Sequence, residues 1–262
     1  MIDASKFMIG TSGYSFDDWI GPFYPPGTTS RDMFTQYVKR FRMVELNFTF
    51  YSMPYPRTLE ALAGKSPDNF LFWIKANQEI THKGNLRICR EFLEDLSPIT
   101  TRNKLAGVLL QFPQSFHRTI ANREYLAKVI QAMQPAPLAV EFRHVSWDTA
   151  SAVAGLRDRG VTLVIPDEPD LPGLYRPRPA VTSRIGYLRL HSRDPKKWYA
   201  GPADRYDYSY SEQELRELLS HWQNLDQPVD CVNVCFNNCH RGQAAQNAET
   251  FRRILGQIEQ AG

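Results

Sequence analysis

The sequence predicts an α/β fold: a single parallel eight-stranded (β/α)8 barrel over residues 1–262, with long loops at the C-terminal face. Eight short apolar segments alternate with helix-like segments, which is the pattern of a parallel sheet. Eight strands close such a barrel, and 262 residues is a usual length for one. No linker or low-complexity stretch indicates a domain boundary, although a doubly wound open sheet is the structural alternative.

The predicted strands are short runs rich in β-branched and aromatic residues. They cover residues 7–13, 44–51, 70–77, 105–113, 138–144, 162–168, 185–192 and 230–238. The second of them, VELNFTFY, alternates at its start, with Val44, Leu46 and Phe48 in one phase and polar residues in the other. Such alternation usually indicates a strand with one side in water, which raises the question of where Glu45 and Asn47 point.

Capping signals and turn residues separate these strands. We expect Ser30 to cap a helix that ends near residue 40, and Gly160 to follow a helix over residues 149–159. The letters SEQE at 211–214 form a capping box that opens a helix to about residue 224. Further helices are expected over residues 87–96, 120–133 and 244–258. The proline-rich segment between the sixth and seventh predicted strands is expected to hold little helix.

In six of the predicted strands, alternate residues form one apolar face and one polar face. In a barrel one strand face meets the helices and the other meets the lumen, so the polar phase is expected to face inward. Its members are Glu45, Asn47 and Thr49; Trp73, Lys75 and Asn77; Gln111; Glu141 and Arg143; Arg189 and His191; and Asn233 and Asn237, with Asp167 as a further carboxylate at the end of the sixth strand. These side chains come late in their strands, at the face where barrel enzymes keep their sites. Because burying many charges is costly without water or a ligand, we expect a polar pocket at the barrel mouth, with internal salt bridges as the alternative.

The composition limits the class of protein. The formal net charge is +3 without a dense block of Lys or Arg, so nucleic-acid binding is neither demanded nor excluded. No apolar run is long enough to span a membrane, and the start of the chain lacks the pattern of a signal peptide. The four cysteines are too few for a disulfide framework in a chain of this size. A cytoplasmic protein is therefore the expectation.

A series of motifs extends along nearly the whole chain. In order they read IGTSGYSFDDWIGPFYP, VELNFTFYSMP, FWIKANQEITH, LAGVLLQFPQSF, VEFRHVSW, YLRLHSRD, YDYSYSEQEL and FNNCHRGQAAQNAETF. On these motifs the chain resembles the DUF72 family of YecE-like proteins, which implies a TIM barrel but no reaction, because the family is called uncharacterised. The family's recurring positions correspond here to Gly13, Trp19, Glu45, Asn47, Tyr51, Lys75, His82, Gln111, Glu141, Arg143, Trp147, Arg189, His191, Asn237, Asn238 and Asn247. Phe48, Thr49 and Ser192 depart from the family pattern and are expected to narrow the mouth without removing a charge.

Proton transfer is the chemistry that these residues suggest first. Two carboxylates with separated pKa values can act as acid and base, and a histidine can shuttle a proton near neutral pH. The expected catalytic residues are Glu45, Glu141, His191 and Lys75. A Schiff base at Lys75 is disfavoured, because the two nearby carboxylates should keep its amine protonated.

Three cations in the expected pocket, Lys75, Arg143 and Arg189, favour an anionic ligand over a divalent metal ion. The expected binding residues are Asn47, Tyr51, Gln111, Arg143, Asp167, Arg189, Asn237 and Asn238. The start of the last helix, near Arg241 and Gly242, offers free N–H groups that would complete an anion site.

No cofactor is predicted, and a site for magnesium or manganese is the alternative. The barrel is similar to the group that includes endonuclease IV and xylose isomerase, which is usually metal-dependent. The residues that would form such a site are Glu45, Glu141, Asp167 and His191.

The preferred hypothesis is an enzyme of the hydrolase, lyase or isomerase type that acts on a small phosphorylated or carboxylated metabolite. The alternative is a nucleic-acid-binding or nucleic-acid-processing protein, by analogy with endonuclease IV-like barrels and because the loop 191–210 is long, basic and aromatic. A lid over a small ligand explains that loop equally well. A non-catalytic sensor is a third hypothesis, and no membrane partner is expected.

Overall fold

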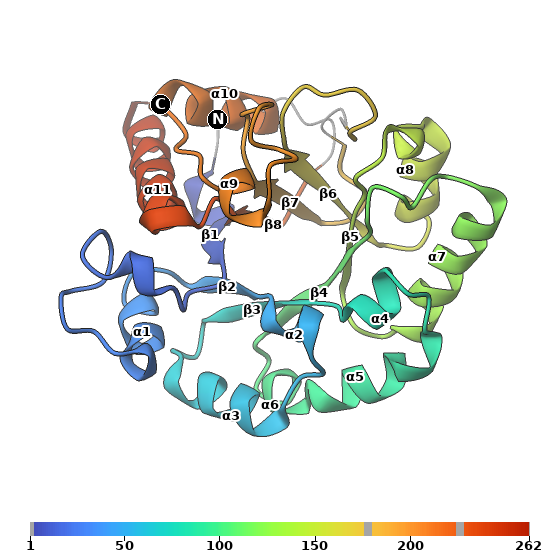
Figure 1. Ribbon diagram of the computed structural model, residues 1–262, viewed down its shortest axis with the longest axis horizontal. Coiled ribbons are helices and arrows are strands. Elements are labelled where there is room, and N and C mark those ends of the chain that lie inside the picture. Colours follow the sequence, from blue (N-terminus) through green and yellow to red (C-terminus); the bar gives the residue numbers. More distant parts are fainter. Residues whose placement is uncertain (1–2, 176–179, 224–227, 262) are drawn as a thin grey trace.

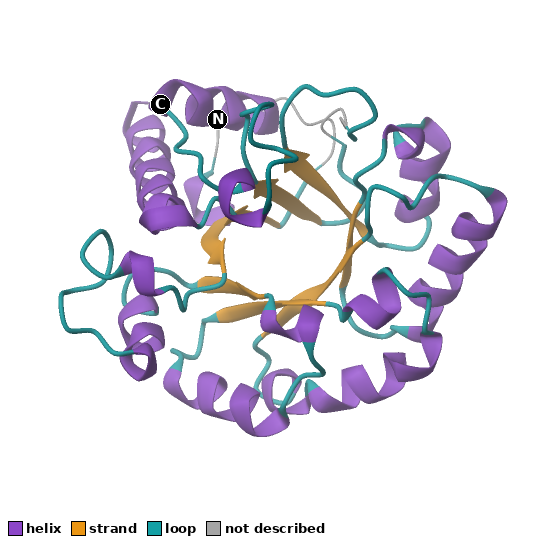
Figure 2. Ribbon diagram, in the orientation of Figure 1, coloured by secondary structure: helices purple, strands orange, loops and turns teal. Residues whose placement is uncertain are grey.

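The computed structural model describes residues 3–175, 180–223 and 228–261, and its strands form one closed parallel barrel in sequence order (Figure 1, Figure 2). The strands are β1 (Phe7–Ser12), β2 (Met43–Leu46), β3 (Leu71–Lys75), β4 (Leu105–Gln111), β5 (Leu138–Glu141), β6 (Thr162–Asp167), β7 (Ile185–Leu190) and β8 (Cys231–Phe236). β8 pairs with β1, where Ile9 lies opposite Val234, and this pairing closes the barrel. The predicted fold class and the number and order of the predicted strands are therefore confirmed, and the open-sheet alternative is wrong.

Long helices form an outer ring around the barrel, and the short helices α2, α4 and α9 lie nearer its opening (Figure 1). The long helices are α1 (Ser30–Tyr37), α3 (Pro56–Lys65), α5 (Cys89–Asp95), α7 (Ile120–Ala132), α8 (Ala150–Arg157), α10 (Glu212–Gln223) and α11 (Gln243–Ala261). The short ones are α2 (Phe48–Tyr51), α4 (Gln78–Thr81), α6 (Ser97–Thr100) and α9 (Pro202–Arg205), with single 3-10 turns η1 (Ala4–Lys6), η2 (Asp17–Trp19), η3 (Leu86–Ile88), η4 (Val145–Trp147) and η5 (His240–Gly242). Across the described ranges, no helix combines the length and the apolar character needed to cross a bilayer.

Most of the expected helix ends agree with the structure. In the capping box, the Ser211 Oγ accepts the Glu214 N–H at 3.3 Å, and the Glu214 Oε2 accepts the Ser211 N–H at 2.8 Å. Gly160 follows α8 with a φ of +62°, the left-handed conformation that favours glycine. Ser30 is instead the first residue of α1, because Thr29 has the extended conformation of the N-cap.

The proline-rich segment between β6 and β7 contains no helix in its described residues. Residues 176–179 of that segment lie outside the described part of the chain.

The predicted strand 44–51 is wrong in its second half. β2 ends at Leu46, and Phe48–Tyr51 forms the short helix α2. The Thr49 Oγ1 donates to the Leu46 O at 3.1 Å and to the Lys75 O at 2.6 Å, so it ties this turn to the end of β3. Strand propensity depends on context, and here local side-chain hydrogen bonds outweigh it.

Separate apolar clusters lie on the two faces of the barrel. Val44 and Leu46 face outward and pack in the cluster beneath the helices, as their phase predicted. A second cluster fills the lumen toward the N-terminal ends of the strands. Its members are Met43, Trp73, Leu109, Ala139, Val164, Tyr187 and Cys235. Polar lumen residues therefore gather above this second cluster, toward the C-terminal ends of the strands.

The close approach of β1 to β2 requires a glycine at position 10, because a Cβ there would lie 2.1 Å from the Met43 O. We expect Gly10→Ala to lower the free energy of unfolding by about 3 kcal/mol or more, since a backbone atom must move to accommodate the methyl group. Gly256→Ala, on α11, is the matched control: no atom lies within 4 Å of its Cβ position. Helix propensity should raise the stability of that variant by about 0.5–1 kcal/mol. Urea unfolding measures both values, and a Gly10→Ala protein as stable as wild type would contradict the described register of β1 and β2.

Candidate functional site

One arginine occupies the centre of the polar lumen. Arg189, on β7, is 1% exposed and lies between Glu45 on β2 and Glu141 on β5, both 0% exposed. Its Nε and Nη2 donate to the two carboxylate oxygens of Glu45 at 2.8 and 2.7 Å. Its Nη1 donates to the Glu141 Oε2. Carboxylates from two different strands thus share a single guanidinium.

Arg143 extends this arrangement to a third carboxyl group. Its Nη2 lies 2.5 Å from the Glu141 Oε1, and its Nη1 donates to the Glu168 Oε2 at 2.8 Å. The Glu168 side chain, just after β6, is 1% exposed. We refer to Glu45, Glu141, Arg143, Glu168 and Arg189 as the ion network. The internal salt bridges that were the alternative to a polar pocket therefore account for much of the charge in the lumen.

The two carboxylates beside Arg189 remain ionised. Burial opposes the ionisation of Glu45, but the Arg189 charge and hydrogen bonds from Ser12 and Tyr187 outweigh burial and lower its pKa. The Ser12 hydroxyl donates to the Glu45 Oε1 at 2.5 Å, and the Tyr187 hydroxyl donates to Oε2 at 2.6 Å. Burial also opposes the ionisation of Glu141, yet the two arginines of the ion network hold its pKa well below the usual range. Neither carboxylate is suited to exchange a proton near neutral pH.

His191 contacts the ion network in its neutral form. Its Nε2 lies 3.0 Å from the Arg143 Nη2, and its Nδ1 lies 2.9 Å from the Asn237 Nδ2. Complete burial, followed by the Arg143 charge, lowers the pKa of this imidazole to about 3. The expectation that His191 shuttles a proton near neutral pH is therefore wrong, and the ring instead joins Arg143 to Asn237.

Glu168 is the member of the ion network that the sequence analysis missed. Burial raises its pKa to about 7, and the Arg143 charge offsets only part of that effect. The structure places Glu168 in the lumen phase of β6, because Val164 faces the lumen and every second residue shares that face. The sequence carries no signal for this phase, since residues 162–166 are nearly apolar on both faces. The predicted carboxylate, Asp167, lies in the opposite phase, where the Arg193 Nε and Nη2 donate to its two oxygens at 2.9 and 3.0 Å. The prediction of Asp167 as a mouth residue is wrong by one position.

A pocket of about 450 Å³, which we call the mouth pocket, opens at the C-terminal ends of the strands. Its polar lining consists of Ser12, Ser15, Asn47, Lys75, Arg189, Asn237 and Cys239. Its aromatic lining consists of Tyr14, Phe16, Phe48, Phe50, Tyr51 and Tyr206. Tyr51 is 75% exposed, so it belongs to the rim of the pocket. The mouth pocket thus combines a polar base with aromatic walls.

Lys75, at the end of β3, presents its amine to the mouth pocket. Within the part of the chain that the structure describes, no hydrogen bond or ion pair holds its Nζ, which lies 4.3 Å from the centroid of the Phe50 ring. Burial, followed by the Arg189 charge, lowers the pKa of Lys75 to about 8, although Glu45 and Glu141 act in the opposite direction. With this pKa most of the amine is protonated at neutral pH, although the two arginines offset the effect of the carboxylates.

Two other predicted binding residues make structural contacts outside the mouth pocket. The Gln111 Nε2 donates to the Phe112 O at 2.8 Å. The Asn238 Nδ2 donates to the Tyr208 O at 2.8 Å and to the Asn247 Oδ1 at 2.9 Å, so it holds the preceding loop against α11. Their amides are therefore engaged within the protein.

The chain itself occupies part of the expected anion site at the start of α11. The Arg241 N–H donates to the Asp18 Oδ2 at 2.6 Å. The Trp19 Nε1 donates to the Cys239 O, also at 2.6 Å. The segment after β1 therefore covers the region before α11, and Asp18 accepts one of the N–H groups that the expected anion site would use.

The loop 191–210 folds over the C-terminal end of the barrel. Trp198 is 3% exposed, and the Arg143 Cζ lies 5.7 Å from the centroid of its ring. Tyr206, from the same loop, lines the mouth pocket. The loop thus shields the ion network and forms one wall of the pocket.

The residues of the alternative metal site do not form a ligand set. Arg189 lies between Glu45 and Glu141, and Asp167 is bound by Arg193 on the other face of β6. Among residues 3–175, 180–223 and 228–261, no group of three His, Cys, Asp or Glu side chains could hold a metal ion.

The fold and this site define a class of protein: a (β/α)8 barrel with a buried ion network beside a mouth pocket. The family model described as "Protein of unknown function DUF72" matches residues 8–261, and the chain belongs to this family. The UPF0759 protein YunF of Bacillus subtilis is 31% identical, over 97% of this chain and 96% of its own length. A DUF72 family protein of Thermotoga maritima is 39% identical with a TM-score of 0.89, over 95% of this chain and 99% of that one. A DUF72 family protein of Enterococcus faecalis is 27% identical with a TM-score of 0.82, over 95% of each chain. The resemblance seen in the motifs is confirmed.

Removing Arg189 would leave Glu45 without its cation. We expect Arg189→Met to lower the free energy of unfolding by about 3–5 kcal/mol, which is typical of breaking a buried ion pair. Chemical denaturation at neutral pH measures this loss. Arg90→Met breaks an exposed pair with Glu94 and is the matched control; its unfolding midpoint should stay close to that of wild type. Equal midpoints for the two variants would rule out a central role for Arg189.

The raised pKa of Glu168 should make the folded protein less stable as the pH rises. In the folded protein the pKa of Glu168 is about 7, above its ordinary value of 4.5. The stability that Glu168 contributes to the folded state is therefore fully present below pH 4.5 and is lost as the pH rises through 7. Glu168→Gln imitates the protonated group and removes this loss. Relative to wild type, the variant should gain about 3 kcal/mol of stability between about pH 4.5 and about pH 8. Denaturation curves across this range measure the gain, and parallel curves for the two proteins would show that the pKa of Glu168 is not raised.

Proposed function

We propose that this protein is an enzyme that binds a small polar anion, a phosphorylated or carboxylated metabolite, in the mouth pocket. The observation that carries this proposal is the Lys75 amine, which faces the pocket and has no hydrogen-bond or ion-pair partner among the described residues. Withdrawing a cation from water is costly unless it is paired, and the anionic group of a ligand supplies the missing partner.

The surroundings of Lys75 suit such a ligand. Asn47 and Asn237 add amide groups to the lining. One N–H of the Asn47 amide is donated to the Ser12 Oγ, and the Asn237 amide nitrogen contacts His191, so each amide has one further N–H for a ligand. The Ser12 hydroxyl already donates to Glu45. Arg189 lies at the base and stays bound to its two carboxylates, so Lys75 supplies the unpaired positive charge for an anion. The aromatic side chains around the opening offer apolar contact to the carbon skeleton of a metabolite.

Glu168 is the group best suited to proton exchange in this reaction. Its pKa of about 7 lies near neutral pH, where a general acid or base is most effective. Arg143 contacts both Glu168 and His191. His191 in turn contacts Asn237 in the lining of the mouth pocket, so these contacts link the position of Glu168 to the ligand site. A guanidinium and an amide do not pass a proton on, so the proposal requires the ligand to reach Glu168 directly or through one water molecule. Proton transfer of this kind is compatible with a hydrolase, lyase or isomerase.

The nucleic-acid alternative has less support. Two basic side chains of the loop 191–210 are paired within the protein, Arg193 with Asp167 at 2.9 Å and Lys197 with Asp207 at 2.8 Å. These cations are less available to phosphates than the sequence alone suggested. Binding of DNA or RNA that weakens steeply with salt would favour this alternative over the metabolite site.

Lys75→Met tests the anion site directly. Isothermal titration with inorganic phosphate and with citrate should show binding to the wild-type protein at constant ionic strength. We expect Lys75→Met to weaken this binding at least about tenfold, as the loss of a charge-assisted hydrogen bond predicts. Lys83→Met removes a lysine on the surface, where it pairs with Glu79, and should retain the wild-type affinity. If all three proteins bind these anions alike, Lys75 is not the ligand-binding cation.

Turnover tests the enzymatic part of the proposal. NMR spectra of the wild-type protein with a panel of phosphorylated and carboxylated metabolites should show conversion of at least one compound. Glu168→Gln should lower that rate at least about tenfold while phosphate affinity is unchanged, because a general acid or base contributes on the order of a hundredfold or more. Anion binding without conversion of any compound would instead favour a sensor.

A further inference from the structure

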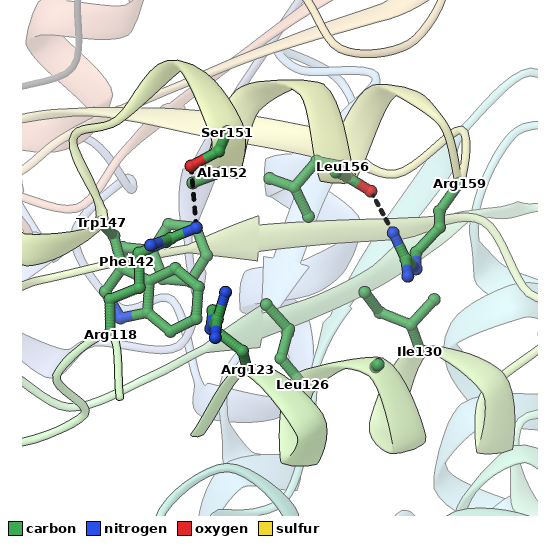
Figure 3. A pocket seen from close by; sticks show the side chains of 12 residues that line it. Arg118, Arg123, Leu126, Ile130, Phe142, Trp147, Ser151, Ala152, Leu156 and Arg159 are labelled. Atoms are coloured by element: carbon green, nitrogen blue, oxygen red, sulfur yellow. Dashed lines mark hydrogen bonds between the residues drawn. The ribbon is translucent and has the colours of Figure 1, made fainter. Parts of the chain in front are cut away.

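A groove on the outside of the barrel has features that the mouth pocket does not explain. It lies between α7 and α8, over β5, and its volume is about 250 Å³ (Figure 3). The two helices make few close contacts with each other, whereas α10 and α11 pack together. Ala127 on α7 and Ala152 and Gly155 on α8 line the groove, and their small size leaves the space open. We call it the α7–α8 groove.

The floor of the α7–α8 groove is apolar. Its larger side chains are Leu126, Ile130, Phe142, Trp147 and Leu156, and each is at most 7% exposed. The rings of Phe142 and Trp147 stack with 4.2 Å between their centroids and 6° between their planes. Stacked and buried rings form a rigid surface against which an apolar molecule can pack.

Three arginines border this floor. Arg118 and Arg123 lie at one end of the groove, and Arg159 lies at the other (Figure 3). Within the described ranges none of the three forms an ion pair, and no lining residue carries a carboxylate. The Arg118 Nη2 donates to the Ser151 Oγ at 2.8 Å, but its buried Nε has no partner in the described structure. Positive charge at the ends of an apolar floor complements a molecule that is both apolar and anionic.

We propose that the α7–α8 groove is a binding site for a small carboxylate with an apolar body, such as a medium-chain or aryl carboxylate. The floor takes the apolar body, and Arg118 and Arg123 bind the carboxylate through the fork of donors that a guanidinium presents. The site lies outside the barrel, so it is independent of the function proposed for the mouth pocket.

The size of the groove limits the ligand. A volume of about 250 Å³ is the volume that about eight water molecules occupy in the liquid. It suits a ligand with on the order of ten non-hydrogen atoms. Arg123 and Ile130 are separated along α7 by about 10 Å, at about 1.5 Å per residue. An eight-carbon carboxylate, octanoate, has this size and length and is therefore the probe.

Isothermal titration of the full-length protein with octanoate tests the proposal. Wild type should bind one molecule with a Kd below about 1 mM. Arg118→Gln and Arg123→Gln should each weaken binding about tenfold or more, since each removes a charged donor to the carboxylate. Arg90→Gln, on the surface of α5, is the matched control and should bind octanoate as wild type does.

Gly155→Leu tests the location of the site. An ideal Cβ at Gly155 meets no atom closer than the Arg159 Nη1 at 3.7 Å, and leucine favours the helix, so the unfolding temperature should not fall. The leucine side chain would fill the groove and abolish octanoate binding, whereas Lys75→Met should leave it unchanged.

Two further probes separate the parts of the ligand. 1-Octanol lacks the charge and acetate lacks the apolar body, so each should bind at least about tenfold more weakly than octanoate. The proposal is overturned if wild type does not bind octanoate, if Gly155→Leu binds it with unchanged affinity, or if octanol binds equally well.

Discussion

Arg189 is the side chain on which the polar interior of this barrel depends. It is almost completely buried, and it lies between a carboxylate from β2 and another from β5. Charges persist in such an interior only when they are paired and hydrogen-bonded, so Glu45, Glu141 and Arg189 require one another. The three strands that carry them are far apart along the chain, and the network therefore also constrains how these strands lie across the lumen. The apolar cluster around Trp73 and Tyr187 fills the lumen on the other side of this layer.

The same network determines which groups remain available to a ligand. The carboxylates beside Arg189 stay ionised and bound, and the neutral ring of His191 is held between Arg143 and Asn237. The Lys75 amine and the Glu168 carboxyl, by contrast, have pKa values of about 8 and about 7, and burial is the largest cause of both shifts. Perturbed values of this kind often mark functional sites, although structural ion networks produce them too. Lys75 faces the mouth pocket without a hydrogen-bond or ion-pair partner in the described chain, which makes it the better marker of the two.

Much of the fold and part of the site could be predicted because both depend on periodicity. Alternation along single strands was enough to assign Glu45 and Arg189 to the lumen. It failed on β6, because the segment TLVIP is nearly apolar in both phases and so did not distinguish Asp167 from Glu168. It also failed after Leu46, where the hydrogen bonds of Thr49 convert apparent strand sequence into helix α2. The α7–α8 groove was not predicted, because it depends on the spacing between two helices.

The sequence by itself determined the number and order of the strands, the phase of most lumen residues and the family to which the chain belongs. These properties follow from local periodicity and from motifs that are read along the chain. Only the tertiary structure decided which charges are partners and which pKa values are shifted. Glu45 and Arg189 are 144 residues apart in the sequence, and their bond exists only when the barrel closes. The same closure buries Lys75, Glu168 and His191, and burial, the largest cause of their pKa shifts, is a property of the folded chain alone.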